Sequence, residues 1–286
     1  MPVFELPEFY DFPDPSLSEP DGLLAVGGDL STGRLIKAYE NAIFPWYNEP
    51  PILWFSPDPR FVIFPQKFRV SRSLQKVIRQ SIFTVTYNTK FSEVMRACAT
   101  VPRKEENHDL LDTEELVNSS DLSTNLDIGD IADSNNKADS DDITKHDLYD
   151  NHVDQANPVN HDVNDDDETG TWITDDMLQA YHHLHKIGRA HSVEVWKEGK
   201  LCGGLYGVTV GKFFCGESMF YKEPNASKVA LVYLIRKMQE QGFTLLDTQM
   251  HTAHLAKFGA EFISRDQYLS LLWPGLQEGT LEFPGV

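Results

Sequence analysis

Hydrophobic and polar residues follow two different periods along this chain, which predicts a mixture of helices and strands. Apolar residues at helical spacing predict helices over 31–41, 69–80, 89–99, 171–190, 225–242 and 254–260. Alternating or β-branched runs predict strands over 43–47, 52–64, 81–88, 191–197, 201–210, 212–220 and 243–250. Meandering strands followed by a helix and a further strand indicate an α+β fold with a mixed central sheet.

Local signals place several ends of these elements. Ser31 and Thr174 are the expected N-caps of the helices predicted within 31–41 and 171–190. Gly188 and Gly242 stand near helix ends, where glycine commonly stops a helix. The sequence KEGK at 197–200 predicts a hairpin turn between two strands.

The pattern divides the chain into two domains and an insertion. Residues 1–62 are rich in turn signals and short aromatic strands, which predicts a small N-terminal α/β domain, and residues 63–286 form a second domain. Residues 105–168 contain no Phe or Trp and carry 21 Asp and Glu against two Lys. Such a segment buries too little apolar surface to offset the entropy of ordering, so we expect a disordered acidic insertion.

Composition narrows the class of protein. The net charge is −19, but outside the acidic insertion 23 basic residues face 23 acidic ones, so a local basic patch remains open. Three scattered cysteines do not form a disulfide framework or a zinc site. The N-terminus lacks the basic and apolar regions of a secretion signal, and no run approaches the roughly 18 apolar residues of a membrane span. We expect a cytoplasmic protein that acts as a monomer without a membrane partner.

The strand predicted over 243–250 carries an acid and an amide, Asp247 and Gln249. Strand alternation turns both toward the face of Phe243 and Leu245, and Thr248 toward the other face. Burying either polar group without a partner is unfavourable. The pair is therefore either hydrogen-bonded scaffolding or a reaction centre in which an ionised acid backs an orienting amide.

Other polar and aromatic positions also allow two interpretations. Glu217 follows Gly216 in an apolar strand and is either a buried ion pair or a site residue. Trp46, Trp54 and Trp172 are either core residues or platforms on which a base stacks.

A basic face is predicted on the helix at 69–80. Arg69, Arg72, Lys76 and Arg79 share one side of it, which is either a solvated surface or a contact for phosphates. A histidine cluster elsewhere lacks the HExxH spacing and a suitably placed acid, so we expect no metal at His182, His183, His185 and His191.

Ten motifs taken together resemble one family of enzymes. They are GGDLS, IFPWY, ILWFSPDPR, GTWIT, YHHLHKIGRAHSVEVW, GGLYGV, FCGESMF, NASKVAL, LLDTQ and HLAKFGA. In this order and spacing they closely resemble the leucyl/phenylalanyl-tRNA–protein transferases of bacteria, over residues 10–102 and 169–272.

The resemblance implies an aminoacyltransferase. It would move leucine or phenylalanine, or methionine, from aminoacyl-tRNA to the α-amine of proteins with N-terminal Arg or Lys, which feeds N-end-rule degradation. The implied fold is a small N-terminal domain plus a GNAT-like catalytic domain, and no cofactor is implied.

The same resemblance implies roles for particular residues. Asp247 and Gln249 match the catalytic acid and amide. Trp46 and Trp172 match the aminoacyl-adenosine pocket, and Glu217 and Leu205 match substrate-binding positions. We expect Asp247 to polarise and hold the Gln249 amide, and we expect Arg72, Lys76 and Arg79 to contact tRNA.

Two departures and two alternatives stand beside this interpretation. Thr248 replaces a cysteine that is common in the family, and the acidic stretch replaces a short loop. An acetyl-CoA-dependent acyltransferase would need a glycine-bearing phosphate loop, which YKEPNASK at 221–228 lacks. A non-enzymatic adaptor that binds tRNA or N-terminal degradation signals is the second alternative.

Overall fold

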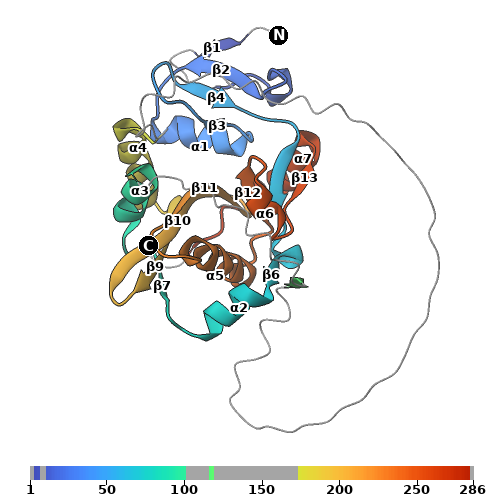
Figure 1. Cartoon of the computed structure of the whole chain (residues 1–286). Helices are drawn as coiled ribbons and strands as arrows, with labels where there is room; N and C mark the ends of the chain where they lie inside the picture. The colour runs from blue at the N-terminus through green and yellow to red at the C-terminus, as the bar shows by residue number, and fades with distance from the viewer. Residues whose placement is uncertain (1–2, 7–10, 101–115, 119–172, 284–286) are drawn as a thin grey trace, which may run out of the picture.

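The computed structural model describes residues 3–6, 11–100, 116–118 and 173–283, and of 116–118 it describes the backbone alone. It has the mixed α+β architecture expected from the sequence (Figure 1). The helices of the described residues are α1 (Thr32–Glu40), α2 (Arg72–Arg79), α3 (Phe91–Thr100), α4 (Asp175–Lys186), α5 (Ala226–Gln241), α6 (Ala253–Ala256) and α7 (Arg265–Gln277). Short 3₁₀ turns lie at Pro15–Leu17 and Pro65–Lys67.

A seven-stranded mixed sheet forms the centre of the protein. Its strand order is β13-β5-β12-β11-β10-β9-β7; β11 and β12 pair in parallel and the other neighbours are antiparallel. Its strands are β5 (Arg60–Ile63), β7 (Thr84–Tyr87), β9 (Ala190–Lys197), β10 (Lys200–Val210), β11 (Phe213–Tyr221), β12 (Leu245–Gln249) and β13 (Glu261–Ile263).

A second sheet comes from the N-terminal part of the chain. Its strand order is β1-β2-β4-β3, with β1 (Phe4–Leu6), β2 (Leu23–Gly27), β3 (Phe44–Pro45) and β4 (Leu53–Phe55). The chain then passes into the central sheet at β5, so the proposed division at residue 62 falls within that strand. Figure 1 shows this smaller sheet above the central one, with α1 between them.

Helices cover both faces of the central sheet and enclose two apolar cores. Helix α5 packs on β9, β10 and β11 from one side, while α3 packs on the same strands from the other (Figure 1). Neighbouring residues of β10 show the alternation directly, because Leu205 belongs to the core under α5 and Tyr206 to the core under α3 and α4. Alternating strand positions thus supply both cores, as expected for a sheet covered on both faces.

Local signals fixed several boundaries well. Thr174 caps α4, accepting a hydrogen bond from Met177 N at 3.3 Å, whereas Ser31 precedes α1 without a side-chain cap. The predicted turn at 197–200 is confirmed: Glu198 and Gly199 both have positive φ angles between β9 and β10. Gly242 ends α5 in the left-handed conformation that favours glycine.

Some predictions about elements need correction. Arg69 lies in the short strand β6 (Arg69–Ser71) rather than on the following helix, because the Ser71 hydroxyl caps α2 at Leu74 N. Strand β13 and helix α7 were not predicted, and β13 is too short to show a period.

The expected insertion at 105–168 falls almost wholly outside the described residues, as does Trp172. Within it, Leu116–Asn118 forms strand β8, which pairs antiparallel with β6. Over these three residues the chain is paired into a strand, and the disordered acidic insertion stays a prediction for the rest of the segment.

Candidate active site

Two neighbouring strands of the central sheet separate at one point. Strands β11 and β12 pair in parallel from Phe213 and Leu245 as far as Cys215 and Asp247. Beyond this point each strand carries an extra residue relative to its other neighbour: Glu217 in β11 and Thr248 in β12. A β-bulge redirects the side chains next to it, so the sheet opens where the acids and the amide lie.

The bulge in β12 changes the predicted pattern of faces. Thr248 and Gln249 both line the pocket described below, whereas Asp247 lies beneath its wall. Gln249 has a φ angle of 61°, a conformation that strand residues rarely adopt. The Thr248 hydroxyl donates to the Phe61 carbonyl of β5 at 2.8 Å, whereas the Gln249 side chain reaches Glu217 of β11, so simple alternation ends at Asp247.

A pocket of about 840 Å³ occupies the opening between the strands. Its walls come from β3 and the residue after it, from β10 and β11, from α5, and from the end of β12 with α6. Leu205, Trp46, Glu217 and Gln249 all line this one pocket. The structure thus brings together four of the site residues that were predicted from distant parts of the chain.

One end of the pocket is apolar. Its lining includes Leu205 of β10, Met219 of β11, Leu231 and Leu234 of α5, and Leu246 of β12. All but Met219 are buried members of the core under α5. This end can hold an aliphatic or aromatic side chain, as apolar clefts with few polar groups commonly do.

Asp247 is held on all sides by donors. Its Oδ1 accepts a hydrogen bond from the backbone N–H of Gln249 at 2.8 Å. Its Oδ2 accepts one from the Tyr268 hydroxyl at 2.9 Å and lies 3.3 Å from Nε of Arg60. The acid is 1% exposed, so it acts on neighbouring protein groups rather than directly on a bound molecule.

The side-chain amide of Gln249 is held by Glu217 and not by Asp247. Its Nε2 donates to Oε1 of Glu217 at 3.2 Å, while Asp247 holds the backbone of the same residue. The expectation that Asp247 holds the side-chain amide is therefore wrong. A carboxylate accepts hydrogen bonds, so it orients the amide with Oε1 directed away from Glu217 and available as an acceptor.

Two buried tyrosines complete the polar cluster. The Tyr39 hydroxyl donates to Oε1 of Glu217 at 2.7 Å, and the Tyr181 hydroxyl donates to Oε2 at 3.2 Å. The two phenol oxygens are also 2.6 Å apart. The two phenol groups supply only two hydrogens for these three oxygen–oxygen contacts. A proton on Glu217 would supply the hydrogen for the third.

Glu217 carries a raised pKa that suits this arrangement. Burial disfavours the charged carboxylate and is the main cause, and the nearby Asp247 charge adds to it. Hydrogen bonds from both tyrosines and from Gln249 act in the opposite direction, and the resulting pKa is about 7. Burial beside this carboxylate also raises the pKa of the Tyr39 and Tyr181 hydroxyls, so both remain donors.

The predicted basic residues lie apart from the pocket. Arg72, Lys76 and Arg79 are exposed on α2, which packs against α5 on the side opposite α3. Trp46 is 38% exposed at the pocket, with its ring 5.6 Å from Phe55 edge to face. Trp54 is instead fully buried in the core.

Sequence reasoning missed four residues of the site. Tyr39 and Tyr181 occupy apolar faces of helices and look like ordinary core residues. Tyr268 lies on α7, which was not predicted. Arg60 did leave a signal, since an arginine opens the apolar run RFVI, and a buried cation requires a partner.

The four histidines do not gather around a common centre. His182 contacts Ser92, His185 stacks on Phe91 and contacts the Ala190 carbonyl, and His191 contacts Asn88 and Thr209. Burial lowers the pKa of His191 to about 4. Within the described ranges, no three His, Cys, Asp or Glu side chains gather as metal ligands would.

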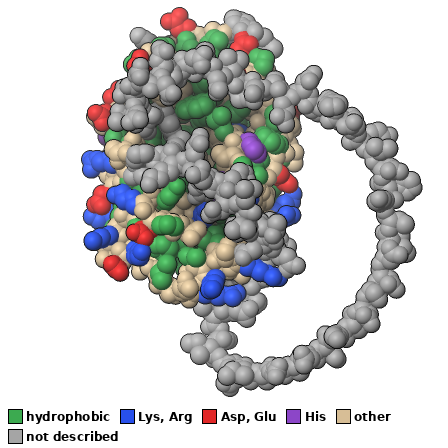
Figure 2. All heavy atoms as spheres, in the orientation of Figure 1, with side chains coloured by type: hydrophobic (Ala, Val, Ile, Leu, Met, Phe, Trp, Pro, Cys, Tyr) green, Lys and Arg blue, Asp and Glu red, His purple; other side chains and the backbone are tan. Residues whose placement is uncertain are grey.

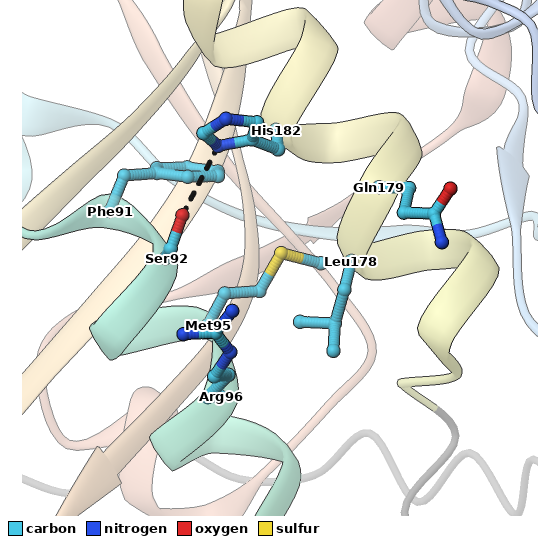
Figure 3. Close-up of a pocket in the computed structure, with 7 residues that line it drawn as sticks. All are labelled: Phe91, Ser92, Met95, Arg96, Leu178, Gln179 and His182. Atoms are coloured by element: carbon cyan, nitrogen blue, oxygen red, sulfur yellow. Dashed lines mark hydrogen bonds between the residues drawn. The ribbon is translucent and has the colours of Figure 1, made fainter.

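A second hollow, of about 180 Å³, lies between α3 and α4 (Figure 3). Phe91, Ser92 and Met95 of α3 face Leu178 and His182 of α4 across it, and Ser92 and His182 are hydrogen-bonded at 3.1 Å. It contains none of the predicted site residues.

In the described part of the chain, no helix combines the length and apolar character that a membrane crossing needs.

Comparison with known proteins agrees with the motifs. The chain matches the family model described as leucyl/phenylalanyl-tRNA protein transferase over residues 62–119 and 143–273. The model of that family's N-terminal domain matches residues 28–58.

Relatives align over almost the full length. A leucyl/phenylalanyl-tRNA–protein transferase of Syntrophobacter fumaroxidans is 42% identical over 279 residues, which cover 97% of this chain and 93% of the relative. The one from Desulfatibacillum aliphaticivorans is 41% identical, covering 99% and 94%, and that of Myxococcus xanthus is 40% identical, covering 98% and 94%. This chain is an enzyme and belongs to the leucyl/phenylalanyl-tRNA–protein transferase family.

Proposed function

We propose that this enzyme moves leucine, phenylalanine or methionine from aminoacyl-tRNA to the α-amine of proteins that begin with Arg or Lys. The observation that carries this is the pocket itself, which joins an apolar end to the Gln249–Glu217 centre. The apolar end suits the side chain of the transferred residue. The names of the relatives supply the class of donor and acceptor.

The reaction needs positioning more than activation. The amine nitrogen attacks the ester carbonyl carbon, a C–N bond forms, and the C–O bond to the ribose breaks. The amine loses one proton and the departing ribose oxygen gains one, so no metal or nucleotide is consumed. Gln249 Oε1 accepts a hydrogen bond from the attacking amine and so orients it. It does not remove the proton, because a neutral amide is too weak a base.

The remaining residues then take defined roles. Trp46, and Trp172 from outside the described residues, stack on the adenosine that carries the amino acid. Leu205 contacts the amino-acid side chain. Glu217 sets the direction of the Gln249 amide, and its ionised form favours an acceptor with a cationic first residue.

A transfer assay tests the function directly. The enzyme is incubated with Leu-tRNA and one of two peptides that differ only in beginning with Arg or Gly, and products are read by mass. We expect addition of one leucine to the Arg peptide. Binding of tRNA or peptide without any mass shift would favour a binding adaptor, and a shift with acetyl-CoA alone would favour the acetyltransferase alternative.

Transfer should depend on pH through Glu217. Below a pH of about 7 the carboxyl gains a proton. It can then donate to Gln249 Oε1, so the amide reverses and presents a donor to the amine. We expect kcat at saturating peptide to fall as pH drops through about 7. In Glu217→Gln this step should be absent, leaving the titration of the substrate amine itself, whose ordinary pKa is about 7.7–8.0.

The pH dependence of the free energy of unfolding also reports on the Glu217 carboxyl. Its pKa in the folded protein lies above the ordinary 4.5, so folding favours the protonated form. This contribution to the free energy of unfolding is complete below pH 4.5 and is lost as pH rises through about 7. Urea unfolding of Glu217→Gln should lack that decline. An identical decline in both proteins would contradict the assigned pKa.

The basic face of α2 should bind tRNA phosphates. Figure 2 shows Lys and Arg side chains at the lower end of the molecule in the region of α2, and Arg72, Lys76 and Arg79 are exposed there. Changing all three to Ala should weaken tRNA binding and reduce the slope of log K against log salt by about 0.7–0.9 for each phosphate that is no longer neutralised. Lys37, Lys90 and Lys200, exposed on other elements, give a control with the same net charge. Equal slopes of log K against log salt in the two triple variants would exclude the α2 face as a contact for tRNA phosphates.

We also propose the wider setting that the family implies. The chain from β5 onward forms a GNAT-like catalytic domain behind the small N-terminal domain, and the enzyme acts as a monomer in the cytoplasm. There it supplies substrates to N-end-rule degradation. The opening between parallel strands β11 and β12 supports the first part.

A further inference from the structure

Arg60 is a cation enclosed by the site without lining its pocket. It opens β5, the strand that pairs with β12, and it is 2% exposed. Its guanidinium carbon lies 4.9 Å from the ring centre of Phe44 and 4.9 Å from that of Tyr268. The side chain is therefore held between one ring from the small sheet and one from α7, each a favourable partner for a cation.

The charge of Arg60 is matched by Asp247. Nε of Arg60 lies 3.3 Å from Oδ2 of the acid, and both side chains are almost wholly buried. Burial acts to lower the pKa of the guanidinium, yet the nearby Asp247 raises it overall. A buried pair of this kind is costly to break, because the remaining charge has no solvent.

The other arm of the guanidinium reaches the small sheet. Nη2 of Arg60 donates to the backbone carbonyl of Ala42 at 2.8 Å. Ala42 has a φ angle of 59° in the turn before β3, and Phe44, Pro45 and Trp46 follow and line the pocket. The Arg60 guanidinium thus contacts the turn that positions the pocket wall formed by Phe44, Pro45 and Trp46 (the Trp46 wall). It also contacts the acid that positions the Gln249 backbone.

We propose that Arg60 is a positioning residue that fixes the distance between the Trp46 wall and the Gln249 amide, an inference that rests on the proposed function. It acts on the reaction step through Asp247 and on the binding of aminoacyl-tRNA through Ala42. A lysine keeps the charge but carries all its donors on one nitrogen, so it cannot reach the separate places that Nε and Nη2 of Arg60 contact.

A double-mutant comparison separates these effects. Arg60→Lys should lower kcat about 10²-fold, the scale of a small misplacement of reacting groups, and should raise KM for aminoacyl-tRNA several-fold. In an Asp247→Asn background, the same change should alter kcat less than about 3-fold while still raising KM. If the kcat losses of Arg60→Lys and Asp247→Asn multiply in the double variant, the proposal is overturned.

A matched control addresses simple loss of stability. Arg34 is also fully buried, lies 3.5 Å from Asp29, and is absent from the pocket lining. Arg34→Lys should lower the melting temperature without changing kcat. If Arg60→Lys does not fold, the charge-free pair Arg60→Met with Asp247→Leu gives the comparison against Asp247→Leu alone. Equal kcat values support the proposal, and a further 10-fold loss in the double variant contradicts it.

Amide hydrogen exchange tests the positioning without any transfer. In Arg60→Lys, the peptides spanning 43–47 and 247–250 should exchange faster together, because Trp46 N–H bonds to Leu53 and Gln249 N–H bonds to Asp247. Arg34→Lys should leave both unchanged. If the wild-type enzyme transfers nothing, the proposed function fails, yet this exchange result still decides the role of Arg60: unchanged exchange in both segments overturns it.

Discussion

Replacing Gln249 with leucine is expected to lower the rate of aminoacyl transfer by about 10²- to 10³-fold, the range seen when one preorganised polar contact to a reacting group is removed. Leucine is similar in size but cannot accept a hydrogen bond from the amine. It also leaves Glu217 without one of its donors. Single-turnover transfer of labelled leucine to a peptide that begins with Arg measures the loss.

Two further variants sharpen this measurement. Gln239→Leu is the matched control, since Gln239 also donates its amide to the protein, at the Pro65 carbonyl 2.7 Å away, and is absent from the pocket lining. It should cost about 1 kcal/mol of stability and leave transfer unchanged. Gln249→Asn, which tolerates the left-handed backbone but is shorter by one methylene, should also lose most activity. Wild-type transfer by a folded Gln249→Leu protein would exclude the amide from the reaction.

Replacing Asp247 with asparagine is expected to reduce both transfer and stability. An asparagine oxygen can still accept from Gln249 N–H, but its NH₂ then faces two donors, Tyr268 and Arg60. The buried guanidinium also loses its counter-charge. Removing one member of such a pair costs about 3–5 kcal/mol, and we expect transfer to fall by about 10²-fold as the Gln249 backbone shifts.

Urea unfolding together with single-turnover transfer tests this result. Asp29→Asn provides the control, because Asp29 pairs with a buried arginine, Arg34, but has a 54% exposed side chain. Because its carboxylate stays in contact with solvent, its loss should cost less stability than the loss of Asp247. Asp247→Ala would add a cavity to the same defect, so asparagine is the cleaner change. A stable Asp247→Asn protein with normal transfer would show that the acid is scaffolding without influence on the amide.

The sequence was informative where a local signal determines the structure. The helix that follows Thr174 begins at the predicted cap, although it ends at Lys186, before the end of the predicted range. The glutamate beside Gly216 and the acid–amide pair stood out because polar groups interrupt apolar strands. These signals identified Glu217 and Gln249, which line the pocket, and Asp247, which is buried next to it.

Partners across the fold left no comparable signal. Tyr39 and Tyr181 are far apart in the chain, and only tertiary packing brings their hydroxyls to Glu217. The extra residue at Thr248 depends on its register against β5, which strand propensity does not encode. For this reason the sequence paired Asp247 with the wrong part of Gln249.

The separation of β11 and β12 at the pocket has a consequence for engineering the enzyme. The apolar end of the pocket is built mainly by β10 and α5, while the polar centre is built by the two bulges. We therefore expect substitutions at the apolar end to change which amino acid is transferred without moving the polar centre. Libraries at Leu231 and Leu234, which have no hydrogen-bonding side chains, could retune the enzyme toward bulkier or unnatural amino acids for labelling protein N-termini, while the groups that align the amine stay unaltered.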